Sequence, residues 1–229
     1  MIKAIVTDIE GTTSAIDFVT QTLFPYARQR MAAFIQEHSD DSRVKPLLRE
    51  AARAANLPEH DLPALAEQLE RWIDEDRKIT PLKGLQGLIW EHGYRNGDFL
   101  AHVYPDAVTT LEQWHRQGLS LYVYSSGSIL AQKLFFGHSE AGDLRPLFRD
   151  YFDTTSGPKR EAASYRTISR DIDMPAQHIV FLSDIVEELD AAAEAGMKTV
   201  WVQRSDTPLH HERHQVVSRF DDIRLDALY

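Results

Sequence analysis

Residues 2–13 read IKAIVTDIEGTT, an apolar run that ends in two acidic residues, a glycine and two threonines. The apolar part favours a short buried strand, and the glycine favours a turn after it. Because side chains two residues apart in an extended chain share a side, we expect Asp8 and Glu10 to project together from the carboxyl end of that strand. Ordinary strand-to-turn junctions also carry such acids, which accept backbone hydrogen bonds there. The remaining motifs therefore have to decide whether the pair is structural or catalytic.

Two carboxylates in one turn suit two kinds of chemistry. A hard cation such as Mg²⁺ prefers carboxylate oxygens and keeps coordination positions for water and a phosphate. Alternatively, one carboxylate attacks phosphorus as a nucleophile while the other moves a proton. Both uses predict a site that handles phosphate.

The composition narrows the classes of protein to consider. With 229 residues, the chain is long enough for one large domain or a domain with an insertion. Its formal net charge of −10 argues against a nucleic-acid-binding surface, which gains affinity from Lys and Arg. It has no cysteine, no apolar run of membrane-spanning length and no signal-peptide pattern. We therefore expect a cytoplasmic protein with no nucleic-acid or membrane partner, acting on a small anionic substrate.

Residues 17–97 show helical periodicity almost throughout and nothing that resembles a buried strand. We expect Asp17 to cap a first helix that reaches about residue 34, with Pro25 kinking or dividing it. This stretch therefore predicts a helical block that follows the first strand. Further helices are expected at residues 42–55, 61–79 and 84–92, between breakers such as Thr80-Pro81 and Asn96-Gly97.

From residue 104 onward, helical and strand patterns alternate. This alternation predicts an α/β fold with a parallel sheet and helices on both faces. In such folds ligands bind beyond the carboxyl ends of the strands. The expected strands are 119–124, about 151–153, 178–182 and 198–202, and the expected helices are 105–117, 129–135, 161–172 and 187–195.

Polar side chains follow four successive predicted strands. Each has a structural alternative, because serine and aspartate often cap helices and lysine is usually a solvated surface residue. Together they instead supply a nucleophile, hydrogen-bond donors for phosphate, a cation and metal ligands, so we favour a phosphoryl-transfer site. The strand ends carry, in order, Asp8 and Glu10, then Ser125 and Ser126, then Lys159, and finally Asp184 with Glu188 one helical turn later.

These motifs resemble those of the haloacid dehalogenase superfamily of aspartate-nucleophile phosphatases, over nearly the full length of the chain. Within it, the chain is similar to the enolase-phosphatases of methionine salvage. Most superfamily phosphatases have Asp where this chain has Glu10, so the glutamate fits the subfamily. The similar stretches are DIEGTT at 8–13, YSSGS at 124–128, QKL at 132–134, FGHS at 136–139 and GPK at 157–159.

The resemblance implies a doubly wound, mostly parallel sheet with an inserted helical cap. Residues 1–14 and 102–229 would form the catalytic core, and residues 15–101 would form the mobile cap. Because such a capped active site would be complete within a single chain, we expect a monomer.

The same resemblance implies a role for each site residue. Asp8 attacks phosphorus and forms an aspartyl-phosphate, and Glu10 protonates the leaving oxygen and then activates water. The remaining roles are phosphate binding by Ser125 and Ser126, charge neutralisation by Lys159, and Mg²⁺ binding by Asp8, Asp184 and the chain at Glu10, with Glu188 orienting the metal's waters.

The implied substrate is 2,3-diketo-5-methylthiopentyl 1-phosphate, which is enolised and then dephosphorylated to the acireductone. The residues account for the second step, but they do not single out the base for enolisation. Glu10 is the most economical candidate, and His38, His92 and His102 are alternatives. Two other interpretations stay open: a phosphatase of the same superfamily for another small phosphomonoester, and a phosphate sensor similar to a receiver domain. Glu10 and the helical block argue against the sensor, which needs neither a proton carrier nor a lid.

Overall fold

The computed structural model describes residues 1–205 and 210–228. The chain divides into two compact units, which we call the sheet unit (Met1–Ile16 and Ala101–Tyr229) and the helical unit (Asp17–Leu100). The function of the second unit as a cap, with the bounds 15–101, stays a prediction. In the described ranges no helix is both long and apolar enough to cross a membrane.

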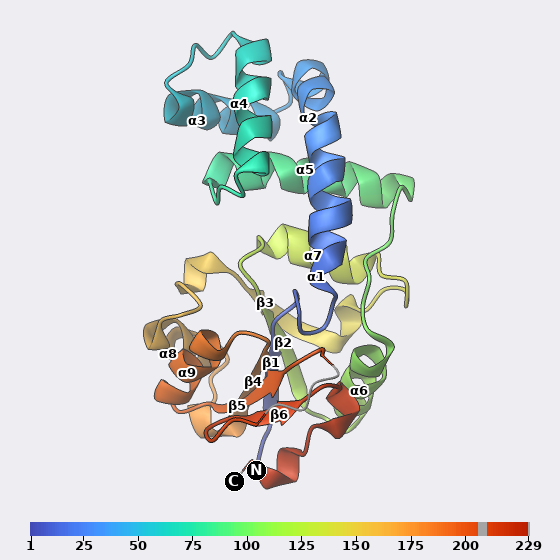
Figure 1. Cartoon of the computed structure of the whole chain (residues 1–229), viewed down its shortest axis with the longest axis vertical. Coiled ribbons are helices and arrows are strands. Elements are labelled where there is room, and N and C mark those ends of the chain that lie inside the picture. The colour runs from blue at the N-terminus through green and yellow to red at the C-terminus, as the bar shows by residue number, and fades with distance from the viewer. Residues whose placement is uncertain (206–209, 229) are drawn as a thin grey trace. The chain divides into compact units, whose positions relative to one another are not determined.

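The sheet unit is built on six parallel strands in the order β3-β2-β1-β4-β5-β6 (Figure 1). The first strand lies in the middle, where Val6 pairs with Tyr122 on one side and Phe181 on the other. Every residue of β1 is buried, as expected for a parallel sheet covered on both faces. The strands are β1 (Ala4–Thr7), β2 (Ser120–Tyr124), β3 (Phe148–Phe152), β4 (Ile179–Ser183), β5 (Lys198–Val202) and β6 (Gln215–Val217).

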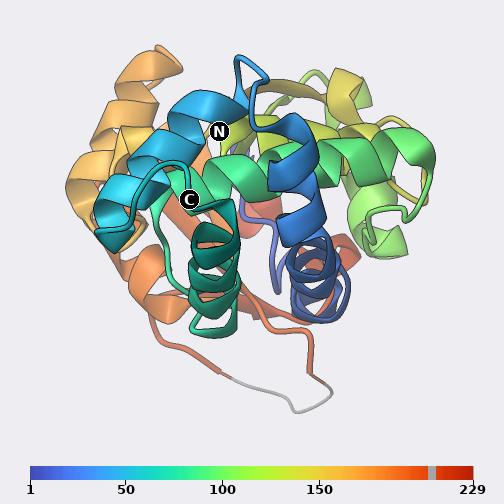
Figure 2. The same ribbon diagram turned by 90° about the horizontal axis from the view of Figure 1, so that it is seen from above.

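Four helices cover the two faces of this sheet. Figures 1 and 2 show α8 and α9 on one face and α6 and α7 on the other. Right-handed crossovers explain this arrangement. The connections through α6 and α7 run toward β3, and those through α8 and α9 run toward β6, so the two pairs of helices lie on opposite faces. The α/β fold predicted from the sequence is therefore confirmed. The helices are α6 (Pro105–Arg116), α7 (Ile129–Gly137), α8 (Ala162–Asp171) and α9 (Val186–Glu194).

The strand bounds differ from the expected ones mainly at the sheet edge. β5 has the expected bounds, and β1, β2 and β4 are shifted by two residues or fewer. β3 begins at Phe148, earlier than expected. The prediction missed its first residues because Arg149 and Asp150 are exposed and interrupt the apolar pattern. β6 was not predicted, since three residues at an edge give too weak a pattern.

In the helical unit, α2 packs on α4 and α5, and α3 packs on the same two helices. Figure 2 shows α5 as the long green helix of this unit. Its core is apolar and includes Met31, Leu65, Leu69 and Leu85, each of which is fully buried. The helical segments are α1 (Ile16–Phe18), whose first residue still belongs to the sheet unit, a π-helical turn (Val19–Leu23), α2 (Phe24–His38), α3 (Val44–Ala55), α4 (Leu62–Asp74) and α5 (Thr80–Asn96).

Two expectations about helix starts were wrong. Asp17 does not cap the first helix, because α1 begins at Ile16 and Asp17 lies in its first turn. Thr80 and Pro81 do not break a helix but start α5, since proline lacks only an N–H that the first turn leaves unpaired. Near Pro25 the helix changes from a π-helical turn to α2 at Phe24, but Leu23 and Phe24 keep helical backbone angles, so the segment is not interrupted.

Candidate active site

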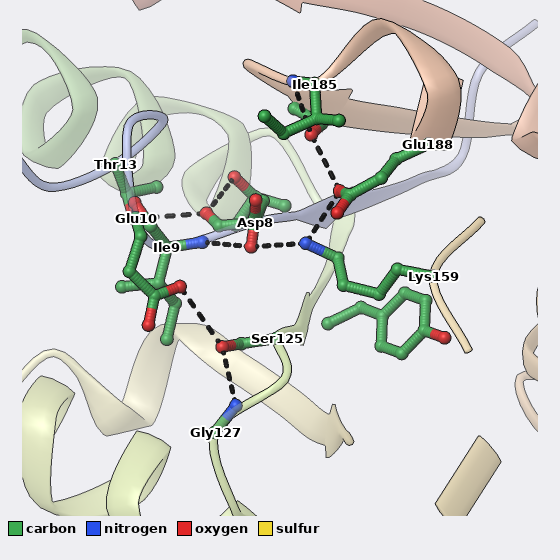
Figure 3. A network of polar contacts seen from close by, with 12 residues as sticks. Asp8, Ile9, Glu10, Thr13, Ser125, Gly127, Lys159, Ile185 and Glu188 are labelled. Carbon is green, nitrogen blue, oxygen red and sulfur yellow. Dashed lines mark hydrogen bonds and ion pairs between the residues drawn. The ribbon is translucent and has the colours of Figure 1, made fainter. Parts of the chain in front are cut away.

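Asp8 lies directly beyond β1 and is held by the backbone. Its N–H donates to Leu182 O at 2.9 Å, and its carbonyl accepts from Thr13 Oγ1 at 3.2 Å. Its Oδ1 accepts from Ile9 N–H at 2.8 Å and lies 2.7 Å from Lys159 Nζ (Figure 3). Within the described ranges, Oδ2 has no hydrogen-bond or ion-pair partner. One carboxylate oxygen is thus fixed, and the other is available.

Lys159 lies between two buried carboxylates. Its Nζ is 2.7 Å from both Asp8 Oδ1 and Glu188 Oε2, and Ser183 Oγ donates to the same Glu188 oxygen at 2.9 Å. The three charged side chains are 5–11% exposed, so water solvates none of them well. Burial raises the pKa of Asp8 and of Glu188, against the effect of Lys159. Although burial alone would lower it, the pKa of Lys159 is raised by the two carboxylates, which keep it a cation.

The backbone around Lys159 is fixed by three hydroxyl groups. Tyr124, Ser164 and Tyr165 donate to the consecutive carbonyls of residues 157–159, at 2.8, 2.7 and 2.6 Å. Desolvation raises the pKa of both tyrosines, so both remain neutral donors. The loop therefore presents the lysine at a defined position without any secondary structure of its own.

Ser125 follows β2 and contacts the acidic turn. Its Oγ donates to Glu10 Oε2 at 3.3 Å and accepts from Gly127 N–H at 3.1 Å (Figure 3). Neither Ser125 nor Ser126 caps the next helix, because Ser128 is the N-cap of α7. Ser126 is exposed in the same loop. The structural alternative considered for these two serines is thus absent.

Asp184 follows β4 and lies against Gly11. Gly11 has a φ of +74°, which favours glycine, and a Cβ on residue 11 would displace the Asp184 carboxylate. Asp184 does not cap α9, whose N-cap is Ile185. Burial and the nearby charge of Asp8 raise the pKa of Asp184 to about 7. No Lys, Arg or His in the described ranges lies within 4 Å of its carboxylate.

The residues at this edge fit a magnesium ion. Asp8 and Asp184 repel each other, and a cation would relieve the repulsion that raises the pKa of Asp184. The described residues contain no group of three His, Cys, Asp or Glu side chains able to hold a metal, and the Glu10 side chain lies at Ser125. Mg²⁺ commonly uses only one or two carboxylates and keeps several waters, so a pair is enough.

The three histidines considered as bases lie in different places. His102 belongs to the sheet unit, and its Nδ1 accepts from Ala15 N–H at 3.1 Å. His38 and His92 belong to the helical unit, where their rings lie 5.3 Å apart and both contact Phe34. His102 therefore has a structural partner, and Glu10 remains the base favoured by proximity to Asp8.

Several residues that shape the site were missed from the sequence. Tyr124 and Tyr165 look like ordinary core aromatics, and only their hydroxyl contacts reveal their task. Gln132 donates through Nε2 to Gly127 O at 2.8 Å and to Phe152 O at 2.9 Å, which fixes the serine loop. Arg204 could have been predicted as a site residue, because it lies just beyond β5 and the other site residues were predicted from their positions after strands.

Comparison with known proteins gives a consistent result. A sequence model of the haloacid dehalogenase-like hydrolases matches residues 2–196. The chain is 57% identical to Enolase-phosphatase E1 of Methylococcus capsulatus over 228 residues, covering 100% of both chains. It is also 57% identical to Enolase-phosphatase E1 of Pseudomonas syringae pv. syringae over 213 residues, covering 93% of this chain and 94% of the relative.

Solved structures show the same fold. The UTR4 protein of Saccharomyces cerevisiae matches with a TM-score of 0.82 and 34% identity, covering 97% of this chain and 100% of that one. CbbY of Rhodobacter sphaeroides, solved in complex with phosphate, shares the fold at a TM-score of 0.63 and 16% identity, covering 100% and 99%. With its parallel sheet and its acids at the strand ends, the chain belongs to the haloacid dehalogenase-like hydrolases and, within them, to the enolase-phosphatase E1 family.

Proposed function

We propose that this chain is a Mg²⁺-dependent enolase-phosphatase of methionine salvage. It converts 2,3-diketo-5-methylthiopentyl 1-phosphate to the acireductone 1,2-dihydroxy-3-keto-5-methylthiopentene and phosphate. The phosphatase half is supported above all by Asp8, whose Oδ1 is held by Lys159 and Ile9 while Oδ2 has no partner in the described ranges. The enolase half is supported by full-length likeness to relatives that carry the name Enolase-phosphatase E1.

In the first phosphoryl transfer, Asp8 Oδ2 forms a bond to phosphorus. The bond between phosphorus and the substrate oxygen breaks, and Glu10 gives its proton to that oxygen. Lys159 lowers the repulsion between the anionic nucleophile and the anionic phosphate, because it already contacts Asp8 at 2.7 Å. The result is an aspartyl-phosphate and the acireductone, whose leaving oxygen is now a hydroxyl group.

Hydrolysis then restores the enzyme. Glu10, now ionised, takes a proton from water as the water oxygen bonds to phosphorus, and the bond between phosphorus and Asp8 breaks. Free phosphate leaves, Asp8 is again a carboxylate, and Glu10 holds a proton, which it loses to water before the next substrate is enolised. Ser125 and Ser126 bind the phosphoryl oxygens throughout, from the loop after β2.

Asp8 and Asp184 would hold Mg²⁺, which supplies positive charge to offset that of the phosphate. Glu188 keeps Lys159 in place, as their 2.7 Å contact indicates. A monomeric, cytoplasmic enzyme completes the proposal.

Enolisation needs one base. The base takes a proton from the carbon next to a carbonyl, the electron pair forms the carbon–carbon double bond, and the carbonyl oxygen takes up a proton from water. Glu10 is the most economical base, because it moves protons in both later steps. The net change is an isomerisation, so no co-reactant is required.

The test is to incubate the purified protein with the diketone phosphate and Mg²⁺, and to follow enol absorbance and free phosphate separately. We expect an enol signal that precedes or accompanies phosphate release. Phosphate release without enol or acireductone would reduce the enzyme to a phosphatase for another small phosphomonoester. Faster turnover of sugar phosphates than of the diketone phosphate would identify that alternative.

A non-catalytic phosphate sensor is distinguished by the fate of the phosphoryl group. A sensor would keep stable phosphate on Asp8, detectable by mass spectrometry of the intact protein after incubation with a phosphodonor. We expect phosphate release to proceed over many turnovers instead. Glu10, held by Ser125 at 3.3 Å, gives the site the proton carrier that a sensor does not need.

A further inference from the structure

Arg204 lies two residues beyond β5, at the same edge of the sheet as Asp8. Its Nε and Nη2 donate to the carbonyl oxygen of Thr12 at 3.0 and 2.7 Å. Its Nη1 lies 2.7 Å from Asp106 Oδ2, and these two side chains are 12% and 5% exposed. A buried arginine thus binds the backbone of the acidic turn from a segment 192 residues away.

Asp106, Tyr104 and Phe220 hold this arginine in place. Asp106 Oδ2 also accepts from Phe220 N–H at 2.7 Å, so the carboxylate is itself fixed. The guanidinium carbon lies 4.1 Å from the centre of the Tyr104 ring. The Tyr104 N–H donates to the carbonyl of Thr13 at 2.9 Å. The carbonyls of Thr12 and Thr13 are therefore both bound from outside the turn.

The turn itself explains why these outer contacts matter. The N–H groups of Thr12, Thr13 and Ser14 all converge on the Ile9 carbonyl, at 3.2, 3.0 and 3.0 Å. Glu10 lies on this turn, and its side chain has only a 3.3 Å contact with Ser125 in the described ranges. The direction of the Glu10 carboxylate thus depends on how the turn is held, and Arg204 makes the charged contact that holds it.

We propose that Arg204 is a positioning residue for proton transfer. Through the Thr12 carbonyl it fixes the turn that carries Glu10, so that the carboxyl stays aligned with the leaving oxygen. The proposal rests on the proposed function, in which Glu10 is the proton carrier. Arg204 lies beyond residues 2–196, the part matched by the family model, and it touches neither Asp8 nor the phosphate-binding serines.

The chemistry requires arginine at this position. A planar guanidinium directs two N–H groups at one carbonyl and a third at a carboxylate, whereas an ammonium on a flexible stem cannot reproduce that fork. Arg204→Lys therefore keeps the charge but loses the geometry, which makes it the informative substitution.

The test compares two substrates in wild type and Arg204→Lys. An alkyl phosphate needs a proton on its leaving oxygen, whereas p-nitrophenyl phosphate releases a stable phenolate without one. Because misplacing a catalytic group by about 1 Å costs on the order of 10²-fold, we expect kcat for the alkyl phosphate to fall about 10- to 100-fold with KM little changed. Single-turnover release of nitrophenolate should fall far less. Equal losses for both substrates, or no loss, would overturn the proposal.

The double variant with Asp106→Asn tests whether the two residues act together. In the part of the chain that the structure describes, the Asp106 side chain contacts Arg204 and Phe220 N–H but not the turn itself, so the double variant should be no slower than Arg204→Lys alone. Additive losses would contradict this. Arg213→Lys is the matched control, because Arg213 also pairs with an aspartate at 2.7 Å, but on an exposed surface away from the turn. Arg213→Lys should leave the turnover of both substrates unchanged.

Chemical rescue covers the case in which a variant folds poorly. Adding guanidinium or methylguanidinium to Arg204→Ala should restore alkyl phosphate turnover, while circular dichroism reports the folded fraction. If guanidinium restores the folded fraction but not the turnover of the alkyl phosphate relative to p-nitrophenyl phosphate, Arg204 has a merely structural role and the proposal is overturned. If wild type releases no phosphate from either substrate, the proposed function fails instead, so the two failures are distinguishable.

Discussion

The two units of this chain treat buried polar groups differently. In the described part of the helical unit, the buried polar or charged side chains are Gln86 and Glu91, and the rest of its core is apolar. The sheet unit buries Asp8, Glu188 and Asp106, and it also encloses the ion-pair partners of these carboxylates. The three buried carboxylates lie just beyond a strand end or in the first turn of a helix.

This difference separates stability from chemistry. Burying an ion pair removes two charges from water, and the desolvation cost often exceeds the gain from pairing. The helical unit limits that cost to Glu91, whose arginine partners stay more than half exposed. The sheet unit accepts it at one edge, where the charges can act on a substrate. The predictions below test this contrast, beginning with the largest effect.

Replacing the nucleophile should have the largest effect. Asp8→Asn keeps the shape of the side chain but cannot form an aspartyl-phosphate, so turnover should fall by about 10⁴-fold or more. Phosphate release measures the loss, and circular dichroism should show an intact fold. As the matched change in the other unit, Glu91→Gln should keep its turnover per folded molecule. Substantial turnover by Asp8→Asn would remove the nucleophile assignment.

Removing the buried cation should cost the most stability. Lys159→Met leaves Asp8 and Glu188 buried without their partner, so the free energy of unfolding should fall by about 3–5 kcal/mol at neutral pH. The loss should shrink as the pH falls, because burial has already raised the pKa of both carboxyls and they then take up protons. Urea unfolding without Mg²⁺ measures it.

The matched control is Arg95→Met in the helical unit. Glu91 is paired with Arg95 at 2.6 Å and with Arg43 at 3.0 Å, and both arginine side chains are more than half exposed. Since Arg43 remains and the lost partner was solvated, the cost should be at most about 1 kcal/mol. Equal losses in the two variants would erase the contrast between the units.

Shortening an apolar core side chain should lower the stability of its own unit, because it removes packing contacts and no charge. Leu69 in α4 and Leu111 in α6 are both fully buried, so replacing either by alanine should cost about 2–5 kcal/mol. Thermal unfolding followed by tryptophan fluorescence reports both units, because Trp72 and Trp90 lie in one and Trp114 and Trp201 in the other. Leu69→Ala should lower the transition of the helical unit first. A single unchanged transition in both variants would argue against separate packing.

The smallest effect concerns His214, a buried polar residue of the sheet unit away from the site. Burial lowers its pKa below the ordinary 6.5, against its contact with Asp190, while Thr199 Oγ1 lies 2.7 Å from Nδ1. The unfolded chain therefore takes up a proton that the native state does not, and stability falls as the pH drops below about 6.5. The slope is at most about 1.4 kcal/mol per pH unit, and His214→Gln should flatten it. An equal slope in the variant would show another origin.

The sequence predicted which residues meet at the sheet edge better than it predicted their contacts, and the roles of these residues in the reaction stay predictions. Asp8 and Lys159 meet, and Ser125 reaches Glu10, because parallel strands bring their carboxyl ends to one edge of the sheet. That Glu188 orients the metal's waters stays a prediction, but its 2.7 Å contact with Lys159 was not foreseen. The sequence pattern predicts that these side chains lie at the carboxyl edge of the sheet, but not which of them contact one another.

The residues that hold the site in place could not be predicted for a physical reason. Tyr165 and Ser164 donate to backbone carbonyls, and any backbone carbonyl is an equivalent acceptor in the sequence. Only the packing of α8 decides which carbonyl they meet. Likewise, a helix was expected to begin at Gly84, but this residue lies inside α5. A Cβ at this position would overlap the Leu47 side chain. Close packing between helices, and not a turn, accounts for that glycine.

The division of the sheet unit into two segments has a consequence for synthesis of the chain. Residues Asp17–Leu100 are contiguous, so the helical unit can fold while the ribosome is still making the rest. β1 is made first, but its neighbours begin at Ser120 and Ile179, so it waits for most of the chain. Asp8 and Lys159 therefore come together late in synthesis, and a truncated product would carry the nucleophile without the setting that makes it reactive.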